Sequence, residues 1–256
     1  MFAQQRRHRL LELLARQGRL TVSEIRDALD VSPATVRRDL AELADQGELV
    51  RVHGGAVHPA ALHGEPVFQQ RAHAAPKAKK AIAERAVEFA AEDCVAYIDA
   101  GTSALAVAQL LLPRPDVTMF TNSLPLLQAG VEGGAHLVAT GGNLRVPSQS
   151  LVGALALDWM EQLRFDVAFI GASGLHAQEG ASVTSLEEAG MKQAAMRRSG
   201  KTVLVADGEK WNAPAAVRFA DWGEFDAWVT DKCLSPAERN GLTRRGVEVI
   251  TVELDT

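Results

Sequence analysis

The sequence predicts an α/β protein of two domains: a winged helix-turn-helix in residues 1–58 and a Rossmann-like, mostly parallel α/β domain in residues 77–256. Three observations predict this. Capped helix starts precede a Gly-Gly hairpin in the first domain. Strand-like and helix-like segments alternate in the second, as they do in parallel α/β folds. Residues 59–76 are rich in Ala, His and Pro and lack periodicity, so they are predicted to be a linker.

Composition excludes several classes of protein. The chain has 256 residues, of which 47% are hydrophobic and 23% charged, which is typical of globular domains. Its two cysteines, Cys94 and Cys233, are too few for a disulfide framework, and both lie in strand-like apolar stretches, so we expect buried thiols. No run of 18 apolar residues and no signal peptide is recognisable, so a cytoplasmic protein without a membrane partner is expected.

Helix signals open the first domain. Leucines at positions 10, 11, 13 and 14 predict a first helix of about three turns that ends at Gly18. Thr21, followed three residues later by Glu24, forms the capping-box pattern and predicts a second, short helix. Ser32 and Pro33 are an N-cap hydroxyl and a proline at the first helical position, so a third helix is predicted to start there.

The third helix is the predicted recognition helix. Its apolar positions Val36, Leu40 and Leu43 are expected to face inward, which leaves Arg37 and Arg38 outside, near the helix start. Arginines there can contact guanine edges or phosphates. Asp39 lies beside them in the sequence, and we expect it either to pair with one of these arginines or to lie on the surface.

A hairpin is predicted after Gly47, which should end the third helix. Residues 48–52 and 53–57 form its two strands, the wing. The first domain carries nine arginines against eight acids, whereas the whole chain has a net charge of -5, so a surface for nucleic acid must be local. The residues predicted to contact DNA are Ser32, Thr35, Arg37, Arg38, Arg51 and His53.

The second domain is predicted from alternating segments. The predicted strands are residues 94–99, 117–121, 136–139, 166–171, 202–207, 227–230 and 247–252, and the clearest helices are 103–112, 124–129 and 186–199. Polar and glycine-rich segments follow the strands, at the sheet edge where ligands bind in open α/β folds. Asp99 is suited to accept hydrogen bonds from sugar hydroxyls, and Lys192 or Lys210 to neutralise a phosphate. Each such segment alone is equally consistent with a tight turn.

Other cofactor chemistry is disfavoured. The first strand is not followed by a GxGxxG pattern, and no GxxxxGK[ST] loop occurs, so neither a dinucleotide nor a nucleoside triphosphate is expected. The seven histidines have no metal-ligand spacing, so no metal is predicted. The four tryptophans are expected to pack in the core or at interfaces. The basic cluster of Lys77, Lys79 and Lys80 is expected to be solvated, with a contact to ligand or DNA as the alternative.

Two blocks of the first domain resemble a known family. The segment from Arg6 to Val57 contains VSPATVRRDLAELADQGELVRVHGGAV and closely resembles the DNA-binding domain of the DeoR family of bacterial regulators, above all in TVRRDL and RVHGGA. Residues 77–231 are similar to that family's sensor domain, which has the fold of ribose-5-phosphate isomerase and glucosamine-6-phosphate deaminase. The matching stretches are DAGTS, TNS, TGGNLR, SLVG, FDVAFIGASG, EEAGMKQAAM and ADGEK.

The resemblance implies a function and a pocket. It implies a homo-oligomeric repressor of a carbohydrate-metabolism operon, bound to double-stranded operator DNA and controlled by a phosphorylated sugar. The residues that it places in the effector pocket are Asp99, Gly101, Thr102, Ser103, Thr121, Asn122, Gly141, Gly142, Lys192 and Lys210. Ser103 stands where the family often has Thr, and the carboxylate of Glu209 beside Lys210 departs from the usual pair of small residues.

Two alternatives remain at this point. The fold also supports aldose-ketose isomerisation and deamination, for which Asp99, Glu187, Glu188 and Lys192 could supply acid-base groups. Such an enzyme would have no use for a DNA-binding domain, so we expect no enzymatic activity. The other alternative is a second domain that only oligomerises.

Overall fold

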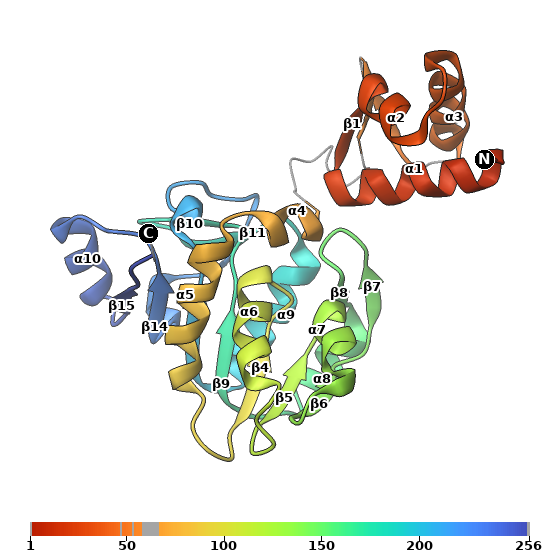
Figure 1. Ribbon diagram of the computed structural model, residues 1–256. Coiled ribbons are helices and arrows are strands. Elements are labelled where there is room, and N and C mark those ends of the chain that lie inside the picture. The colour runs from red at the N-terminus through yellow and green to blue at the C-terminus, as the bar shows by residue number, and fades with distance from the viewer. Residues whose placement is uncertain (1, 47, 53, 58–66, 255–256) are drawn as a thin grey trace. The chain divides into compact units, whose positions relative to one another are not determined.

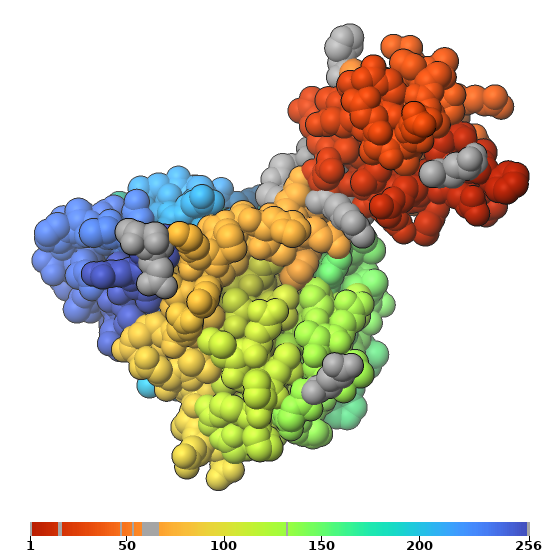
Figure 2. All heavy atoms as spheres, in the orientation of Figure 1, coloured from red at the N-terminus to blue at the C-terminus, as the bar shows by residue number. Residues whose placement is uncertain are grey.

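The computed structural model describes residues 2–46, 48–52, 54–57 and 67–254. The chain divides into two units, Met1–Ala74 and Ala75–Thr256 (Figures 1 and 2). Residues 67–73 of the predicted linker contain a helix, α4 (Phe68–His73), which belongs to the first unit. The sequence predicted only a connection between the domains here, because a helix of six residues is too short to show a period in the sequence.

The helices of the first unit begin and end at the residues that cap them. α1 (Ala3–Gln17) is longer than predicted and ends at Gly18, whose N–H donates to the Leu14 carbonyl at 2.7 Å. α2 (Val22–Leu29) has the predicted capping box of Thr21 and Glu24. α3 (Pro33–Asp45) follows the predicted N-cap, where the hydroxyl of Ser32 accepts from the Thr35 N–H. Gly47, the predicted end of α3, lies outside the described residues.

A three-stranded antiparallel sheet completes the first unit. The predicted hairpin is confirmed as β2 (Val50–Val52) and β3 (Gly55–Val57), and β1 (Arg19–Thr21) adds a strand that the sequence did not predict, in the order β1-β3-β2. Gly55 has to be glycine because a Cβ there would lie 2.0 Å from the Leu20 carbonyl oxygen. The buried side chains of this unit include Leu10, Leu14, Leu20, Ile25, Leu29, Val36, Leu40, Leu43, Leu49 and Ala56.

A seven-stranded parallel sheet forms the centre of the second unit (Figure 1). Its order is β15-β14-β12-β9-β4-β5-β6, and each neighbouring pair is parallel. The strands are β4 (Val95–Ile98), β5 (Thr118–Thr121), β6 (His136–Ala139), β9 (Phe165–Ile170), β12 (Ser199–Val205), β14 (Ala227–Thr230) and β15 (Glu248–Thr251). All seven predicted strands are confirmed, with bounds that differ by up to three residues.

Helices cover both faces of this sheet. α5 (Pro76–Ala86), α6 (Thr102–Leu111) and α7 (Leu124–Ala129) contribute buried residues to the core on one face. α8 (Ala154–Met160) and α9 (Leu186–Arg197) contribute to the core on the other. Further along the chain, α10 (Pro236–Thr243) packs against β15. The α/β fold class is thereby confirmed.

Two small antiparallel sheets were not predicted. One is the hairpin of β7 (Asn143–Arg145) and β8 (Ser150–Val152). The other joins β10 (Gly174–His176), β11 (Gly180–Val183) and β13 (Val217–Ala220). The β7–β8 hairpin places polar side chains at the sheet edge at which the candidate pocket lies.

Two expectations about single side chains are corrected. Cys233 is exposed, because it lies beyond the end of β14, whereas Cys94 is buried as expected. Lys79 is 7% exposed, so the basic cluster is not solvated throughout. Trp211, Trp222 and Trp228 are buried in the core as expected, whereas Trp159 is 57% exposed, so for that residue only packing at an interface stays a prediction. None of the described helices is long and apolar enough to cross a membrane.

Candidate DNA-binding and effector-binding sites

The outer side of α3 carries two arginines. Arg37 and Arg38 are exposed, and neither side chain forms a hydrogen bond or ion pair with a residue that the structure describes. The hydroxyls of Ser32 and Thr35 lie 2.9 Å apart at the helix start, and the Thr35 N–H donates to Ser32 at 3.2 Å. These two predicted DNA contacts therefore also cap the helix, while the arginines remain available to a ligand.

Asp39 does not behave as predicted. It is 3% exposed, and its carboxylate accepts from Arg6 of α1 through Nε at 2.6 Å and Nη2 at 3.0 Å. The same hydrogen bonds raise the pKa of Arg6. Asp39 thus neither pairs with a neighbouring arginine nor lies on the surface, because a helix distant in sequence supplies its partner. The pair joins α1 to α3.

The wing contributes a third exposed arginine. Arg51 lies on β2, opposite Ala56 of β3, and its side chain has no partner within the described part of the chain. His53, which was predicted beside it, lies outside the described residues. The first unit therefore presents guanidinium groups on its third helix and on its hairpin that have no partner among its described residues.

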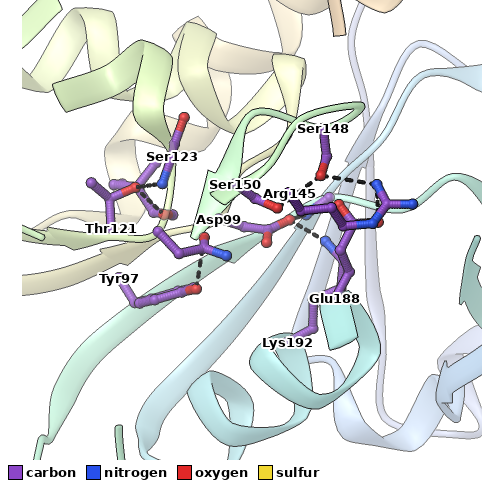
Figure 3. Close-up of polar contacts among 12 residues, drawn as sticks. Tyr97, Asp99, Thr121, Ser123, Arg145, Ser148, Ser150, Glu188 and Lys192 are labelled. Carbon is purple, nitrogen blue, oxygen red and sulfur yellow. Dashed lines mark hydrogen bonds and ion pairs between the residues drawn. The ribbon is translucent and has the colours of Figure 1, made fainter. Parts of the chain in front are cut away.

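The carboxyl ends of β4 and β9 meet at a buried ion pair. Asp99 follows β4 and is 2% exposed; its Oδ2 accepts from the Gly171 N–H at 3.0 Å and contacts Nζ of Lys192. Lys192 lies on α9, is 6% exposed and has its Nζ 5.6 Å from the ring centre of Phe219. The structure therefore brings together two predicted pocket residues, but it already pairs them with each other (Figure 3).

A second cluster beside this pair was missed by the sequence reasoning (Figure 3). Arg145, at the end of β7, has Nη1 3.6 Å from Oε2 of Glu188 and 3.0 Å from the Ser148 hydroxyl. That hydroxyl lies 2.8 Å from the hydroxyl of Ser150, and both serines are fully buried. Arg145 is the last residue of the TGGNLR stretch, but nothing in the sequence indicated its partner.

The side chains of Thr121 and Asn122 form hydrogen bonds that link the end of β5 to β4 and β8. The Thr121 hydroxyl donates to the Ile98 carbonyl at 2.7 Å and accepts from the Ser123 N–H at 3.0 Å. The Asn122 amide accepts from the Tyr97 hydroxyl at 3.0 Å and donates to the Leu151 carbonyl at 3.2 Å. Burial raises the pKa of that tyrosine well above its usual range, so its phenol stays protonated. Thr121 and Asn122 thus lie at the predicted sheet edge, but their side-chain polar atoms already form hydrogen bonds within the protein.

The remaining predicted pocket residues lie on loops after the strands. Gly101 is the N-cap of α6, and no side chain caps that helix, so N–H groups of its first turn, at Thr102 and Ser103, are suited to an anion. Gly142 has φ of 108°, and a Cβ there would lie 2.5 Å from the Val152 carbonyl oxygen, whereas a Cβ at Gly141 would meet no described atom within 4 Å beyond its chain neighbours.

Lys210 lies beyond β12, in the short 3-10 helix η4 (Gly208–Lys210). It is half-buried, and its side chain has no partner among the residues described. The Asp207 carboxylate caps this turn by accepting from the Glu209 N–H at 3.2 Å. No group of three or more acidic, histidine or cysteine side chains suited to a metal ion occurs in the described ranges.

Comparisons with known proteins agree with this two-unit arrangement. Residues 6–61 match the DeoR-like helix-turn-helix domain and residues 74–232 match the DeoR C terminal sensor domain. The chain is 36% identical to the HTH-type transcriptional regulator GlpR of Haloferax volcanii, over 98% of both chains. It is 31% identical to the glycerol-3-phosphate regulon repressor of Escherichia coli, over 89% of this chain and 90% of the relative.

A solved structure of ribose 5-phosphate isomerase A from Methanocaldococcus jannaschii also matches, with a TM-score of 0.39 and 16% identity over 52% of this chain and 53% of that chain. A likeness at this level carries no functional argument. The two family matches and the relatives aligned over most of the chain show the family of this protein without that structure. The chain belongs to the DeoR family of helix-turn-helix transcriptional regulators.

Proposed function

We propose that the protein is a cytoplasmic, homo-oligomeric repressor whose affinity for operator DNA is controlled by a phosphorylated sugar or related metabolite. The observation that carries this proposal is that Arg37 and Arg38 are exposed near the start of α3 and have no partner among the residues that the structure describes. The neighbouring acids of this helix are occupied, Asp39 by Arg6 and Glu42 by Arg7. Within the described residues, therefore, no acid neutralises these guanidinium groups.

The DNA-binding role follows from charge and helix geometry. A recognition helix contacts base edges with residues near its N-terminus, and arginine binds guanine through two hydrogen bonds. In our proposal Arg37 and Arg38 read bases or phosphates, with Ser32 and Thr35 beside them, and Arg51 and His53 of the wing contact the backbone. Two such heads in a dimer would recognise a repeated or palindromic operator.

The effector role rests on the sheet edge. Asp99, Lys192 and the start of α6 lie at the carboxyl ends of the parallel strands, where ligands bind in this class of fold. Lys210 adds a cation without a described partner. The proposed pocket retains the ten predicted residues, with Thr121 and Asn122 shaping it through their contacts to β4 and β8. The name of the Escherichia coli relative, a glycerol-3-phosphate regulon repressor, favours a phosphorylated ligand.

We propose no catalytic activity for this site. Acid-base chemistry needs a group that can take up or release a proton beside the substrate. Asp99 is held by Lys192 and the Gly171 N–H, and Glu188 faces Arg145, so two of the candidate acids have cationic partners. Purified protein should therefore not turn over ribose 5-phosphate or glucosamine 6-phosphate. Turnover of either would revive the enzyme alternative.

Selection of bound fragments from a random double-stranded DNA pool would test the DNA-binding role. Full-length protein is expected to enrich one repeated or palindromic sequence, and R37A and R38A to weaken binding to it. Loss of a bidentate contact to a guanine costs about 1–3 kcal/mol of discrimination. R85A is the matched control, because Arg85 is a partly exposed arginine of α5 paired with Glu88. No enrichment, or equal loss in R85A, would refute the assignment.

A further inference from the structure

One face of α9 carries two opposite charges. Glu188 and Lys192 are four residues apart, one helical turn, so their side chains are neighbours. Each faces an opposite charge from a different part of the second unit. Lys192 contacts Asp99 at the end of β4, whereas Glu188 faces Arg145 of the β7–β8 hairpin (Figure 3).

The two ion pairs differ in closeness and burial. The Lys192 and Asp99 side chains are in direct contact and are 7% and 3% exposed. Nη1 of Arg145 lies 3.6 Å from Oε2 of Glu188, and these side chains are 17% and 10% exposed. A separation of 3.6 Å is longer than an N–H···O hydrogen bond. The Arg145–Glu188 pair is therefore the weaker one, and it lies nearer to solvent.

Arg145 also has the surroundings of an anion-binding residue. Its Nη1 lies 3.0 Å from the Ser148 hydroxyl, which lies 2.8 Å from that of Ser150. A guanidinium group offers planar, paired N–H donors that match the oxygens of a phosphate or carboxylate. Both serines are fully buried, so the hairpin holds polar groups at this position instead of apolar ones.

We propose that Arg145 binds the anionic group of the effector, and that Glu188 occupies Arg145 until that anion displaces it. This inference rests on the proposed effector function and adds a residue and a displacement step to it. A ligand phosphate carries more negative charge than one carboxylate. It can also accept hydrogen bonds from Arg145 at a normal distance, whereas the carboxylate of Glu188 lies 3.6 Å from the guanidinium nitrogen. Displacement leaves Lys192 and Asp99 in place.

The displacement makes the site selective for charged ligands. An uncharged sugar has no group that replaces Glu188 beside the guanidinium, so it would leave the pair intact. A phosphorylated form of the same sugar gains the Arg145 contact and moves the end of β7 away from α9. Because Arg145 ends β7 and Glu188 lies on α9, ligand binding changes how the hairpin is held against the helix.

Isothermal titration calorimetry on the full-length protein tests the inference. The probes are glycerol 3-phosphate, ribose 5-phosphate, fructose 1-phosphate and inorganic phosphate, with glycerol, ribose and fructose as uncharged counterparts. We expect R145Q to bind the best phosphorylated probe at least about tenfold more weakly, the loss of one charge-assisted hydrogen bond. R145K should lose less, and E188Q should bind at least roughly threefold more tightly because a like charge is removed.

The matched control is R197Q. Arg197 lies on the same helix and pairs with Glu161 at 3.3 Å, but both side chains are more than half exposed. R197Q is expected to bind as the wild type does. The double variant R145Q/E188Q removes both charges together, so it controls for an unpaired carboxylate in R145Q, and it should still bind weakly.

The outcomes separate this inference from the proposed function. If the wild type binds a phosphorylated probe and R145Q or the double variant binds it equally well, the role of Arg145 is refuted while the effector function stands. Weaker binding by E188Q would refute the displacement. If the wild type binds none of the probes, the inference and the effector function both fail. Unfolding curves of each variant exclude misfolding as the cause of a loss.

Discussion

Replacing Asp39 with asparagine removes the charge that joins α1 to α3. The carboxylate is 3% exposed and accepts from Arg6 at 2.6 Å and 3.0 Å. Removing one partner of a buried ion pair costs about 3–5 kcal/mol. The Arg6 side chain keeps 14% exposure, so water solvates part of the orphaned charge, and one amide hydrogen bond can remain. We therefore expect D39N to lower the free energy of unfolding of the first unit by about 2–3 kcal/mol.

That loss is large for a unit of this size. A domain is stable by about 0.05–0.15 kcal/mol per residue, and each kcal/mol shifts the midpoint of a small domain by about 4–8 °C. Calorimetry of full-length protein should show the midpoint of the first unit falling by roughly 8–24 °C. R7Q is the control, because Arg7 pairs with Glu42, which is 47% exposed, and such a pair contributes less than about 1 kcal/mol. A D39N midpoint within the R7Q shift would refute the reasoning.

The remaining predictions concern titration and thiol chemistry. The pKa of Glu24 is lowered, first by the hydrogen bond from the Thr21 N–H, so its stabilising effect is present above the ordinary value of 4.5 and is lost as pH falls through the lower folded value. E24Q should therefore flatten the acid limb of the unfolding profile of the first unit, and an unchanged limb would contradict this. Native protein should react with Ellman's reagent at Cys233 only, since Cys94 is buried and burial raises its thiol pKa. C233S should abolish that reaction until the protein is unfolded.

Local chemistry explains which elements the sequence predicted well. The capping box at Thr21 and the N-cap at Ser32 are made by side chains and N–H groups three residues apart, so the sequence alone shows them. The central strands of the parallel sheet, such as β4, β9 and β14, are mostly buried and appear as short apolar runs between loops. The predicted carboxyl ends of these strands also indicated the sheet edge at which Asp99 and Lys192 meet.

Contacts between residues far apart in the sequence could not be predicted from it. Arg6 lies 33 residues from Asp39, and Arg145 is 43 positions from Glu188, so neither pairing has a local signal. Cys233 follows an apolar strand closely, but the strand ends at Thr230, and Asp231 and Lys232 separate the cysteine from it. The DNA and effector contacts of individual residues remain predictions, because they depend on partners outside the chain.

The most direct test of the account is the affinity of full-length protein for its selected operator, measured by fluorescence anisotropy with and without a phosphorylated ligand that binds in calorimetry. We expect tighter binding to the operator than to unrelated DNA, and a change of at least about fivefold when the ligand is added, equivalent to a coupling of about 1 kcal/mol or more. Equal affinity for operator and unrelated DNA, or an affinity that the bound ligand leaves unchanged, would contradict it.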